Sequence, residues 1–368
     1  MGRRLGVALA AFGLAAVSPA LATFHQMAIQ ELFVGPPDQA SATSLTPDAQ
    51  AQYVMLRMTS YAQSFVGSNG AFVRVEDADG RLLGRFGSFT SDVTNPGAMT
   101  CAYPTCPAIL IGTQAASTLV GLAFDQIVDG EADRVALPVA GGRVCFVSST
   151  GTGLVDCVAW GNFDCRRAGG CSLANGPRPG DGSANLCDIN YGTPVATGTG
   201  LIFGRSVRRT AFDCASKENS TQFTLAAPTG FPHPVNNANA NHNTDSDADG
   251  LINQLDCADA NSQIWWPSPE VQGLTVAGTA STTISWTSLA SFIGPGATYD
   301  LVRGTLKKLA GFTDAACASP DTTSTMAVGP TAAAVPGDGL YWLVRGGSGI
   351  GCVGTYEANA TILDPICQ

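Results

Sequence analysis

Five aspartates stand close together in the stretch NTDSDADGLINQLDCADAN, in a chain whose charged residues make up only 13% of the total. Counted from Asp245, the spacing is D-x-D-x-D-G-x5-D, which lets alternate carboxylates converge on one cation while Gly250 takes the sharp turn. Such oxygen ligands suit a hard divalent ion. The spacing therefore predicts a Ca²⁺ site whose candidate ligands are Asp245, Asp247, Asp249, the backbone carbonyl of Leu251, Asp256 and Asp259.

Residues 245–256, called here the acidic loop, depart from a helix-loop-helix calcium sensor in two ways. The twelfth position is Asp256 where such a sensor has Glu, and no amphipathic helix precedes Asp245. The pattern thus favours a static site over a regulatory switch. Copper is the alternative ion, and a solvated acidic linker without any ion is the alternative structure for such a charge run.

Groups that could perform covalent or acid-base catalysis are scarce. The three histidines, His25, His233 and His242, have no Ser, Cys or carboxylate neighbour in a spacing typical of a catalytic site. The sequence contains no G-x-S-x-G, H-E-x-x-H or P-loop motif. We therefore expect a protein that is not an enzyme.

The first residues of the sequence predict export. Arg3 and Arg4 precede an apolar run over residues 5–17, and a small-residue cleavage site follows at residues 20–22, as in a secretory signal peptide. No later apolar run has the length that a transmembrane helix needs. The formal net charge of −10 argues against nucleic acid as a partner. We expect a secreted protein, extracellular or at the cell surface, whose partner is an extracellular protein or glycan.

The twelve cysteines predict disulfides, because exported proteins meet an oxidising environment. A turn at Gly151 sets Cys145 opposite Cys157 and Val147 opposite Val155, which favours a cross-strand bridge. Close spacing suggests further pairs between Cys101 and Cys106 and between Cys165 and Cys171, which leaves Cys187 to pair with Cys214. Parity among the last four cysteines predicts that Cys257 pairs with Cys317, Cys352 or Cys367.

Strand patterns dominate the remaining sequence. Short apolar or alternating runs are bounded by Gly, Pro, Asn or Asp, and the DADG turn between FVRV and RLLGRF is typical of a β-hairpin. Only residues 115–128 suggest a short helix. The Asn-rich run over residues 233–244 predicts a flexible linker. Many short strands with such turns favour a β-sandwich or a barrel.

Two stretches of the N-terminal half resemble the bacterial lamin-tail domain. One contains MAIQELFVG, QYVMLRM and the strand pair around VRVEDADGRLLGRF, and the other is GRSVRRTAFDCASKENSTQFTLAAPTGFPHPVNN. Within the second, the positions that match the family pattern are Gly204, Ser206, Val207, Arg208, Asn219, Ser220, Phe223, Pro232, Pro234 and Asn236. The resemblance implies an immunoglobulin-like sandwich over residues 23–237, and it implies no particular activity.

The acidic loop and its continuation resemble the metal-binding repeat of secreted MopE-type proteins and share the alternation of thrombospondin type 3 repeats. The matching positions are Asp247, Asp249, Gly250, Asp256, Cys257, Asp259, Asn261, Pro267 and Glu270. Residues 271–368 resemble a fibronectin type III domain, with Trp286 as the core tryptophan and Tyr341 near the strand tyrosine. Aromatic residues at strand period are more often core than ligand-binding groups, so we expect Trp286, Tyr299 and Tyr341 to pack.

These features predict an all-β chain of two immunoglobulin-like β-sandwiches joined by an acidic calcium-binding connector. The expected segments are a signal peptide (1–22), a lamin-tail-like sandwich with a Cys-rich insertion (23–237), the linker and acidic loop (238–270), and a fibronectin type III-like sandwich (271–368). We expect a non-catalytic binding or scaffold protein. The alternatives are an accessory module of an extracellular hydrolase or nuclease system, and a surface copper-binding protein. Ion binding should order residues 244–270 as a rigid connector docked on the C-terminal sandwich.

Overall fold

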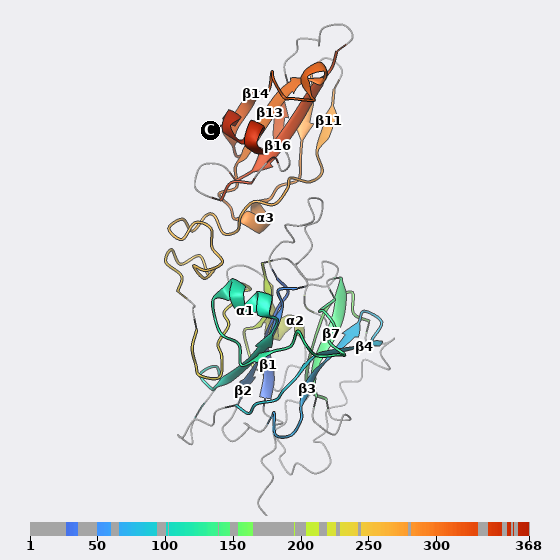
Figure 1. The fold of residues 1–368 in the computed structure, drawn as a ribbon, viewed down its shortest axis with the longest axis vertical. Coiled ribbons are helices and arrows are strands. Elements are labelled where there is room, and N and C mark those ends of the chain that lie inside the picture. Colours follow the sequence, from blue (N-terminus) through green and yellow to red (C-terminus); the bar gives the residue numbers. More distant parts are fainter. Residues whose placement is uncertain are drawn as a thin grey trace, which may run out of the picture.

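The computed structural model describes most of the chain between residues 27 and 367 (Figure 1). The described residues are 27–35, 50–59, 66–93, 101, 103–138, 140–147, 154–164, 195, 204–212, 219–225, 229–241, 244–278, 281–329, 338–347, 352–354, 356 and 360–367. The predictions on the signal peptide, on His25 and His242, and on four cysteines of the N-terminal half lie outside these residues. These cysteines are Cys165, Cys171, Cys187 and Cys214.

Strands form most of the regular structure, as predicted for an all-β chain. They belong to four sheets, of six, four, three and three strands. An N-terminal part contains the two larger sheets, and a C-terminal part contains the two three-stranded sheets (Figure 1). Residues 244–270, called here the connector, run between the two parts as turns and bends without a strand or helix.

The six-stranded sheet has the order β10-β9-β1-β2-β5-β6. Its strands are β1 (Met27–Phe33), β2 (Tyr53–Met58), β5 (Ala108–Gly112), β6 (Gln126–Ile127), β9 (Ser206–Arg209) and β10 (Phe223–Thr224). All neighbours pair antiparallel except β5 and β6, which pair in parallel. The four-stranded antiparallel sheet has the order β4-β3-β7-β8, with β3 (Phe72–Asp77), β4 (Leu82–Ser88), β7 (Gly141–Val147) and β8 (Leu154–Gly161).

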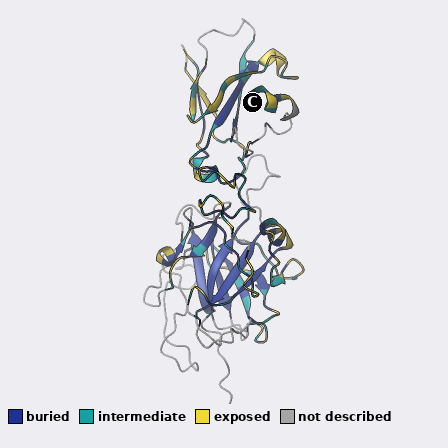
Figure 2. Cartoon of the chain, turned by 90° about the vertical axis from the view of Figure 1, so that its left-hand side faces the viewer, coloured by how far each residue is buried: buried dark blue, intermediate teal, exposed yellow. Residues whose placement is uncertain are grey.

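The two larger sheets enclose a common apolar core. Ile29 and Leu56 of the six-stranded sheet share one buried cluster with Val75 and Phe146 of the four-stranded sheet. Removing such side chains from water is the main driving force for packing the two layers, which appear as buried strands in Figure 2. Strands β1 and β2 are buried at every residue. The six-stranded sheet is therefore also covered on its outer face, where the connector and α1 (Gln114–Val120) contribute to a second apolar cluster.

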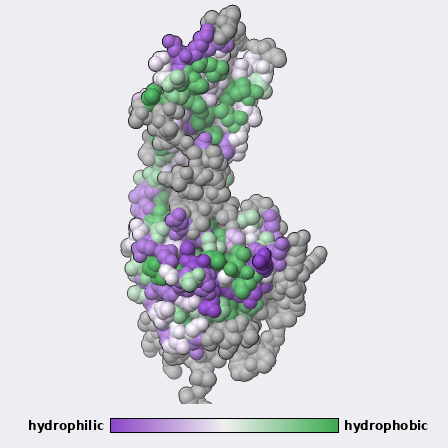
Figure 3. All heavy atoms as spheres, turned by 45° about the vertical axis from the view of Figure 1, so that its right-hand side comes forward, coloured by the Kyte–Doolittle hydropathy of each residue, from purple (hydrophilic) through white to green (hydrophobic). Residues whose placement is uncertain are grey.

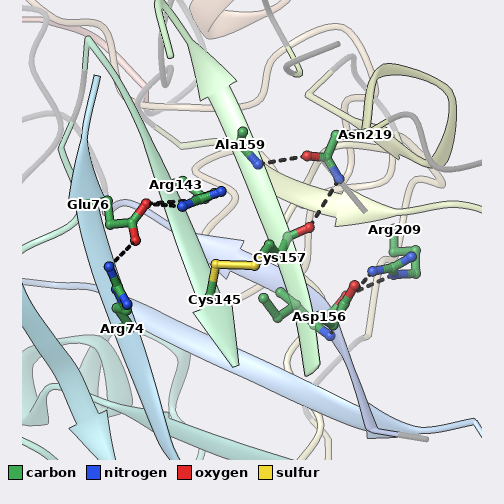
Figure 4. Close-up of a disulfide and its surroundings, with 10 residues drawn as sticks. Arg74, Glu76, Arg143, Cys145, Asp156, Cys157, Ala159, Arg209 and Asn219 are labelled. Carbon is green, nitrogen blue, oxygen red and sulfur yellow. Dashed lines mark hydrogen bonds and ion pairs between the residues drawn. A yellow bond between two sulfur atoms is a disulfide. The ribbon is translucent and has the colours of Figure 1, made fainter. Parts of the chain in front are cut away.

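The hairpin of β7 and β8 carries the predicted cross-strand disulfide. Cys145 lies directly opposite Cys157, and the two are bonded (Figure 4). The predicted pairing of Val147 with Val155 is wrong, because an extra residue in β8 shifts the register and sets Val147 opposite Leu154. The predicted bridge between Cys101 and Cys106 is confirmed.

Buried charges link the two layers of the N-terminal part. Asp156 of β8 accepts hydrogen bonds from Arg209 Nη2 of β9 at 2.6 Å and from the backbone N–H of Ile29 in β1 at 2.7 Å. Burial raises the pKa of Asp156, and the charge of Arg209 opposes that shift. Figure 4 shows a second buried carboxylate, Glu76, between Arg74 and Arg143. Removing one partner would leave the other charge buried and uncompensated, so the partners depend on each other.

The C-terminal part contains two sheets, with the orders β11-β12-β15 and β14-β13-β16. Their strands are β11 (Thr275–Ala277), β12 (Thr283–Ser285), β13 (Tyr299–Thr305), β14 (Ala316–Thr322), β15 (Met326–Val328) and β16 (Leu340–Gly346). Short helices are α3 (Ala290–Ile293), η1 (Leu306–Lys308), α4 (Ala360–Leu363) and η3 (Asp364–Cys367). The two similar runs YDLVRG and YWLVRG pair with each other, as the register of β13 and β16 shows. Cys317 and Cys367 form a disulfide in this part.

The core of the C-terminal part is small. Ile284 and Trp286 point into one buried cluster, as their alternation predicts, together with Tyr299 and Leu301. The rings of Trp286 and Tyr299 meet edge to face at 5.5 Å, so they serve as packing residues. Apolar side chains also reach the surface of this part (Figure 3), and the exposed ones include Val276, Met326 and Val328.

Two predicted elements differ from the structure. The helix expected over residues 115–128 ends at Val120, because Gly121 adopts a left-handed φ of 65° and closes it. The run STQFTLAAP has a composition that predicts a strand, but its first residues lie in α2 (Asn219–Gln222) before the short β10. The side chain of Asn219 explains this turn, since it accepts from Ala159 N at 2.8 Å and donates to Cys157 O at 3.2 Å.

Candidate metal centre

The acidic loop brings three of the predicted ligands together. Asp245, Asp247 and Asp249 each offer a carboxylate oxygen, and these three oxygens all lie within 4.8 Å of one another. The intervening residues Ser246 and Ala248 are exposed. The three carboxylates therefore share the inner side of the loop, and we call them the aspartate cluster.

Backbone amides hold the first carboxylate in place. The two oxygens of Asp245 accept hydrogen bonds from Ala248 N at 2.7 Å and from Gly250 N at 2.9 Å. Ala248 and Gly250 adopt positive φ angles of 63° and 98°. The second of these is a conformation that favours glycine, so the sharp turn lies where the sequence predicts it.

Two oxygens of the aspartate cluster have no hydrogen-bond donor among the described residues. Asp247 Oδ1 accepts from Asp249 N at 3.2 Å, and Asp249 Oδ1 accepts from Leu251 N at 2.7 Å. The Oδ2 atoms of Asp247 and Asp249 are buried and unpaired, and Asp249 is only 7% exposed. A buried carboxylate oxygen without a donor is costly unless a cation or a proton satisfies it. These two oxygens therefore mark the place where a cation fits.

Asn253 closes the acidic loop, and sequence reasoning missed it. Its Oδ1 accepts from Ser246 N at 2.9 Å, and its Nδ2 donates to Ser246 Oγ at 2.7 Å. Its own backbone N–H donates to Thr244 O at 2.8 Å. Asparagine in turn-rich segments commonly makes such bonds, which is the only local signal for this role. The carboxylates are thus carried by a loop that its own side chains shape.

Apolar residues build the acidic loop into the N-terminal part. Leu251 and Ile252 are fully buried and belong to one cluster with Phe33 of β1 and Tyr53 of β2. Trp266, near the end of the connector, joins the same cluster. The whole connector was expected to dock on the C-terminal part, so the attachment of Leu251, Ile252 and Trp266 to the outer face of the six-stranded sheet corrects that prediction for these residues.

The second half of the connector is fastened to the C-terminal part. Cys257 is bonded to Cys352, which confirms one of the three predicted pairings. The backbone N–H of Trp265 donates to Ile293 O of α3 at 2.7 Å. The acidic loop therefore carries an apolar anchor to one part in Leu251 and Ile252, and it is followed by a covalent anchor to the other part.

Burial and the repulsion between carboxylates raise the pKa of two aspartates in the acidic loop. Burial raises the pKa of Asp249 to about 6, and the charges of Asp247 and Asp245 add to the rise. Burial likewise raises the pKa of Asp256 to about 7, and Asp259 is among the charges that add to it. A divalent cation relieves both effects, because it neutralises the carboxylates where they crowd.

The remaining predicted ligands lie near the aspartate cluster but outside it. Asp256 is half-buried and interacts electrostatically with Asp249, while its Oδ1 accepts from Ala258 N at 2.8 Å. Leu251 follows Asp249 in the loop, and Asp259 is exposed. Coordination through Asp256, Asp259 and the Leu251 carbonyl stays a prediction.

The Asn-rich run before the acidic loop is fastened to the N-terminal part over residues 233–241, so its predicted flexibility is wrong there. Asn236 Nδ2 donates to Ala123 O at 3.0 Å. Asn237 donates from its backbone to both carboxylate oxygens of Asp125, at 3.0 and 2.9 Å, and from Nδ2 to Asp92 O at 3.0 Å. Asparagine side chains donate and accept like the backbone, so a polar sequence can still dock.

A buried polar cluster that sequence reasoning missed holds the same segment. Glu31 of β1 is fully buried and accepts hydrogen bonds from the Tyr53 hydroxyl and from His233 N. Arg208 Nη1 lies 2.9 Å from His233 Nδ1. Burial lowers the pKa of His233, and the Arg208 charge lowers it further. The cluster attaches the segment that leads to the acidic loop to the six-stranded sheet. In the sequence, the lone glutamate in the apolar run MAIQELF was the only sign of this cluster.

No family model, no curated protein and no solved structure matches this chain. No helix in the described part is long and apolar enough to cross a membrane. Within the described residues, the aspartate cluster is the one group of three or more potential ligands that could hold a metal ion. The acidic loop is therefore the candidate functional site of this chain.

Proposed function

We propose that this protein is a secreted, non-catalytic binding or scaffold protein of the cell surface, in which Ca²⁺ in the acidic loop stiffens the connector between two immunoglobulin-like modules. One observation carries the proposal. Asp249 is a buried carboxylate whose Oδ2 has no donor among the described residues. It lies in a loop built into the N-terminal core through Leu251, and the loop is followed at once by the Cys257–Cys352 bridge.

Calcium suits the donor set better than copper does. Every candidate ligand is an oxygen, from carboxylates and one carbonyl, and copper prefers nitrogen and sulfur. Calcium accepts about six to eight oxygens in an adaptable geometry, which matches several carboxylates on an irregular loop completed by water. Extracellular calcium at about millimolar concentration fills even a weak site of this kind.

The ion acts as a stiffener because the acidic loop is anchored within its length and again directly after its last residue. Leu251 and Ile252 are fixed in the N-terminal core, and Cys257 is bonded to the C-terminal part. Asp256 is the candidate ligand between these anchors, so an ion that joins it to Asp245, Asp247 and Asp249 restricts the backbone on both sides of Leu251. The connector contains no pair of helices that an ion could open, so it is a spacer and not a switch.

The scaffold role is supported by the architecture and by the use of buried charges. The N-terminal part packs two sheets face to face, and the sequence resembles immunoglobulin-like families in both parts. Buried charged groups such as Asp156 with Arg209 and Asp300 with Arg345 are committed to pairs within the fold. The disulfides support export to an oxidising compartment. The partner proposed is an extracellular protein or glycan.

Calorimetric titration with Ca²⁺ tests the site, with thermal unfolding as a second readout. We expect heat of binding and a raised unfolding midpoint, since a ligand at about 100 times its Kd stabilises by about 2.7 kcal/mol. Asp249→Asn should lose most of both effects. Asp79→Asn, which alters an exposed aspartate in the hairpin of β3 and β4, should behave as wild type. Absence of heat and of any midpoint shift in the wild type would refute the site, and preferential copper binding would favour the alternative ion.

A further inference from the structure

Arg205 occupies the junction between the two parts of the chain. It directly precedes β9 and is only 4% exposed. Its guanidinium carbon lies 3.9 Å from the ring centroid of Phe231 and 4.8 Å from that of Trp265. Its Nη2 donates to the carbonyl oxygen of Ser291 in α3 at 3.4 Å. One side chain therefore touches the N-terminal part, the connector and the C-terminal part.

The packing around Arg205 leaves little room for another arrangement. The rings of Phe231 and Trp265 meet edge to face at 5.3 Å. A side chain at the neighbouring Gly204, which has a φ of 65°, would collide with the ring of Trp266. The two tryptophans of the connector are thus seated directly against residues 204 and 205. A planar guanidinium fits such an aromatic site, where the ring faces attract its positive charge.

The charge of Arg205 interacts with the acidic loop. Burial lowers the pKa of Arg205 to about 10, and the carboxylate of Asp249 opposes that shift. Burial raises the pKa of Asp249, and the charge of Arg205 opposes that rise. The Nη1 atom of Arg205 is buried without a hydrogen-bond partner among the described residues. Aromatic faces attract a cation but do not neutralise it, and Asp249 supplies the negative charge that opposes the cost of burying this guanidinium.

We propose that Arg205 is a positioning residue that couples the charge of the acidic loop to the placement of the C-terminal part. Its plane is held by Phe231 and Trp265, its charge interacts with Asp249 of the loop, and its Nη2 reaches α3. The link to calcium rests on the proposed function of the loop, whereas the link between Arg205 and Asp249 exists in the calcium-free protein.

A double-mutant cycle in calcium-free buffer with a chelator tests the coupling directly. Arg205→Gln, Asp249→Asn and the double variant are compared with wild type by urea unfolding. We expect the changes in the unfolding constant to be non-additive by at least about threefold, since interacting charges couple. Arg81→Gln, which removes an exposed arginine in the β3–β4 hairpin, should combine additively with Asp249→Asn. Additive behaviour of Arg205→Gln would overturn the proposal, whatever calcium does.

Arg205 acts through its charge on the acidic loop and through its planar group on the C-terminal part. Calcium affinity measures the first role, and small-angle scattering measures the second. Arg205→Gln should bind Ca²⁺ about two- to fivefold more tightly, because a repelling charge is removed, and its scattering should show a wider spread of shapes. Arg205→Lys should keep the wild-type affinity and share the wider spread, since lysine retains the charge without the planar group. Wild-type affinity and wild-type scattering in Arg205→Gln would contradict the proposal. If the wild type binds no calcium, the proposed function fails and the double-mutant cycle decides on Arg205 alone.

Discussion

Asp249 is the residue on which the proposed calcium site depends most. It is 7% exposed, it uses Oδ1 to accept from Leu251 N, and its Oδ2 is unpaired within the described residues. Packing alone gives no reason to bury a carboxylate, because an ionised oxygen without a donor costs free energy. The neighbouring aspartates increase that cost, and a cation that binds all of them removes it.

The raised pKa values predict a pH dependence of the calcium-free protein. Asp249 and Asp256 titrate at about 6 and about 7 in the folded chain, above their ordinary value of 3.8. The folded state therefore holds these protons more tightly than the unfolded chain. This contribution to stability is fully present below the ordinary value and is lost as the pH rises through the folded values. We expect calcium-free protein to lose stability between about pH 5 and about pH 8.

Urea unfolding at about pH 5 and about pH 8 measures this loss of stability, first with a chelator and then with Ca²⁺. Calcium should restore stability at the higher pH, because the ion replaces the protons. Asp256→Asn removes one of the titrating groups and should flatten the pH dependence of the calcium-free protein relative to wild type. An equal slope in that variant would show that Asp256 does not titrate as described.

The aspartate cluster could be predicted from the sequence because its spacing is local. Asp245, Asp247 and Asp249 are neighbours in the chain and meet in the structure. Partners distant in sequence leave no such pattern. Glu31 and His233 are 202 residues apart, and each looks ordinary in its own segment. The same holds for Arg205, whose contacts with Trp265 and Ser291 follow only from the folded arrangement.

At the scale of elements, strands with strong apolar patterns were predicted well. Strands β13 and β16 pair as their similar sequences indicate. Strand β14 was missed because ACASPDT is small, polar and contains Pro320. A proline is tolerated there because β14 lies at the edge of its sheet. Neither apolar periodicity nor composition reveals such an edge strand.

The connector is the element whose attachment can be tested covalently. The Cys257–Cys352 bridge spans 95 residues, and a bridge over a long loop restricts the unfolded chain strongly. Replacing both cysteines by alanine should lower the free energy of unfolding by about 2–5 kcal/mol. Calcium affinity should stay unchanged, because Leu251 and Ile252 anchor the acidic loop on the N-terminal sheet.

The matched control is replacement of Cys317 and Cys367, whose bridge spans 50 residues within the C-terminal part. This replacement should also lower the free energy of unfolding, but it should leave the junction between the two parts intact. The distribution of particle dimensions from small-angle scattering should therefore broaden in the variant that lacks Cys257 and Cys352. It should not broaden in the control. Loss of calcium binding together with the first bridge would show that the loop depends on the C-terminal part.

At the scale of the whole molecule, the chain is two β-rich parts held along one connector (Figure 1). The sequence indicates that Leu251, Ile252 and Trp266 must be buried, but an apolar residue does not specify the surface that receives it. The structure assigns them to the outer face of the six-stranded sheet. The contacts of Trp265, Arg205 and the Cys257–Cys352 bridge then set the C-terminal part against this assembly.

The most direct test of the central claim is small-angle scattering of the wild-type protein, recorded with a chelator and again with saturating Ca²⁺. The claim is that an ion in the acidic loop fixes the two parts relative to each other. We expect calcium to narrow the distribution of particle dimensions, and Asp249→Asn to scatter like the chelated wild type under both conditions. Identical wild-type profiles with and without calcium would contradict the claim.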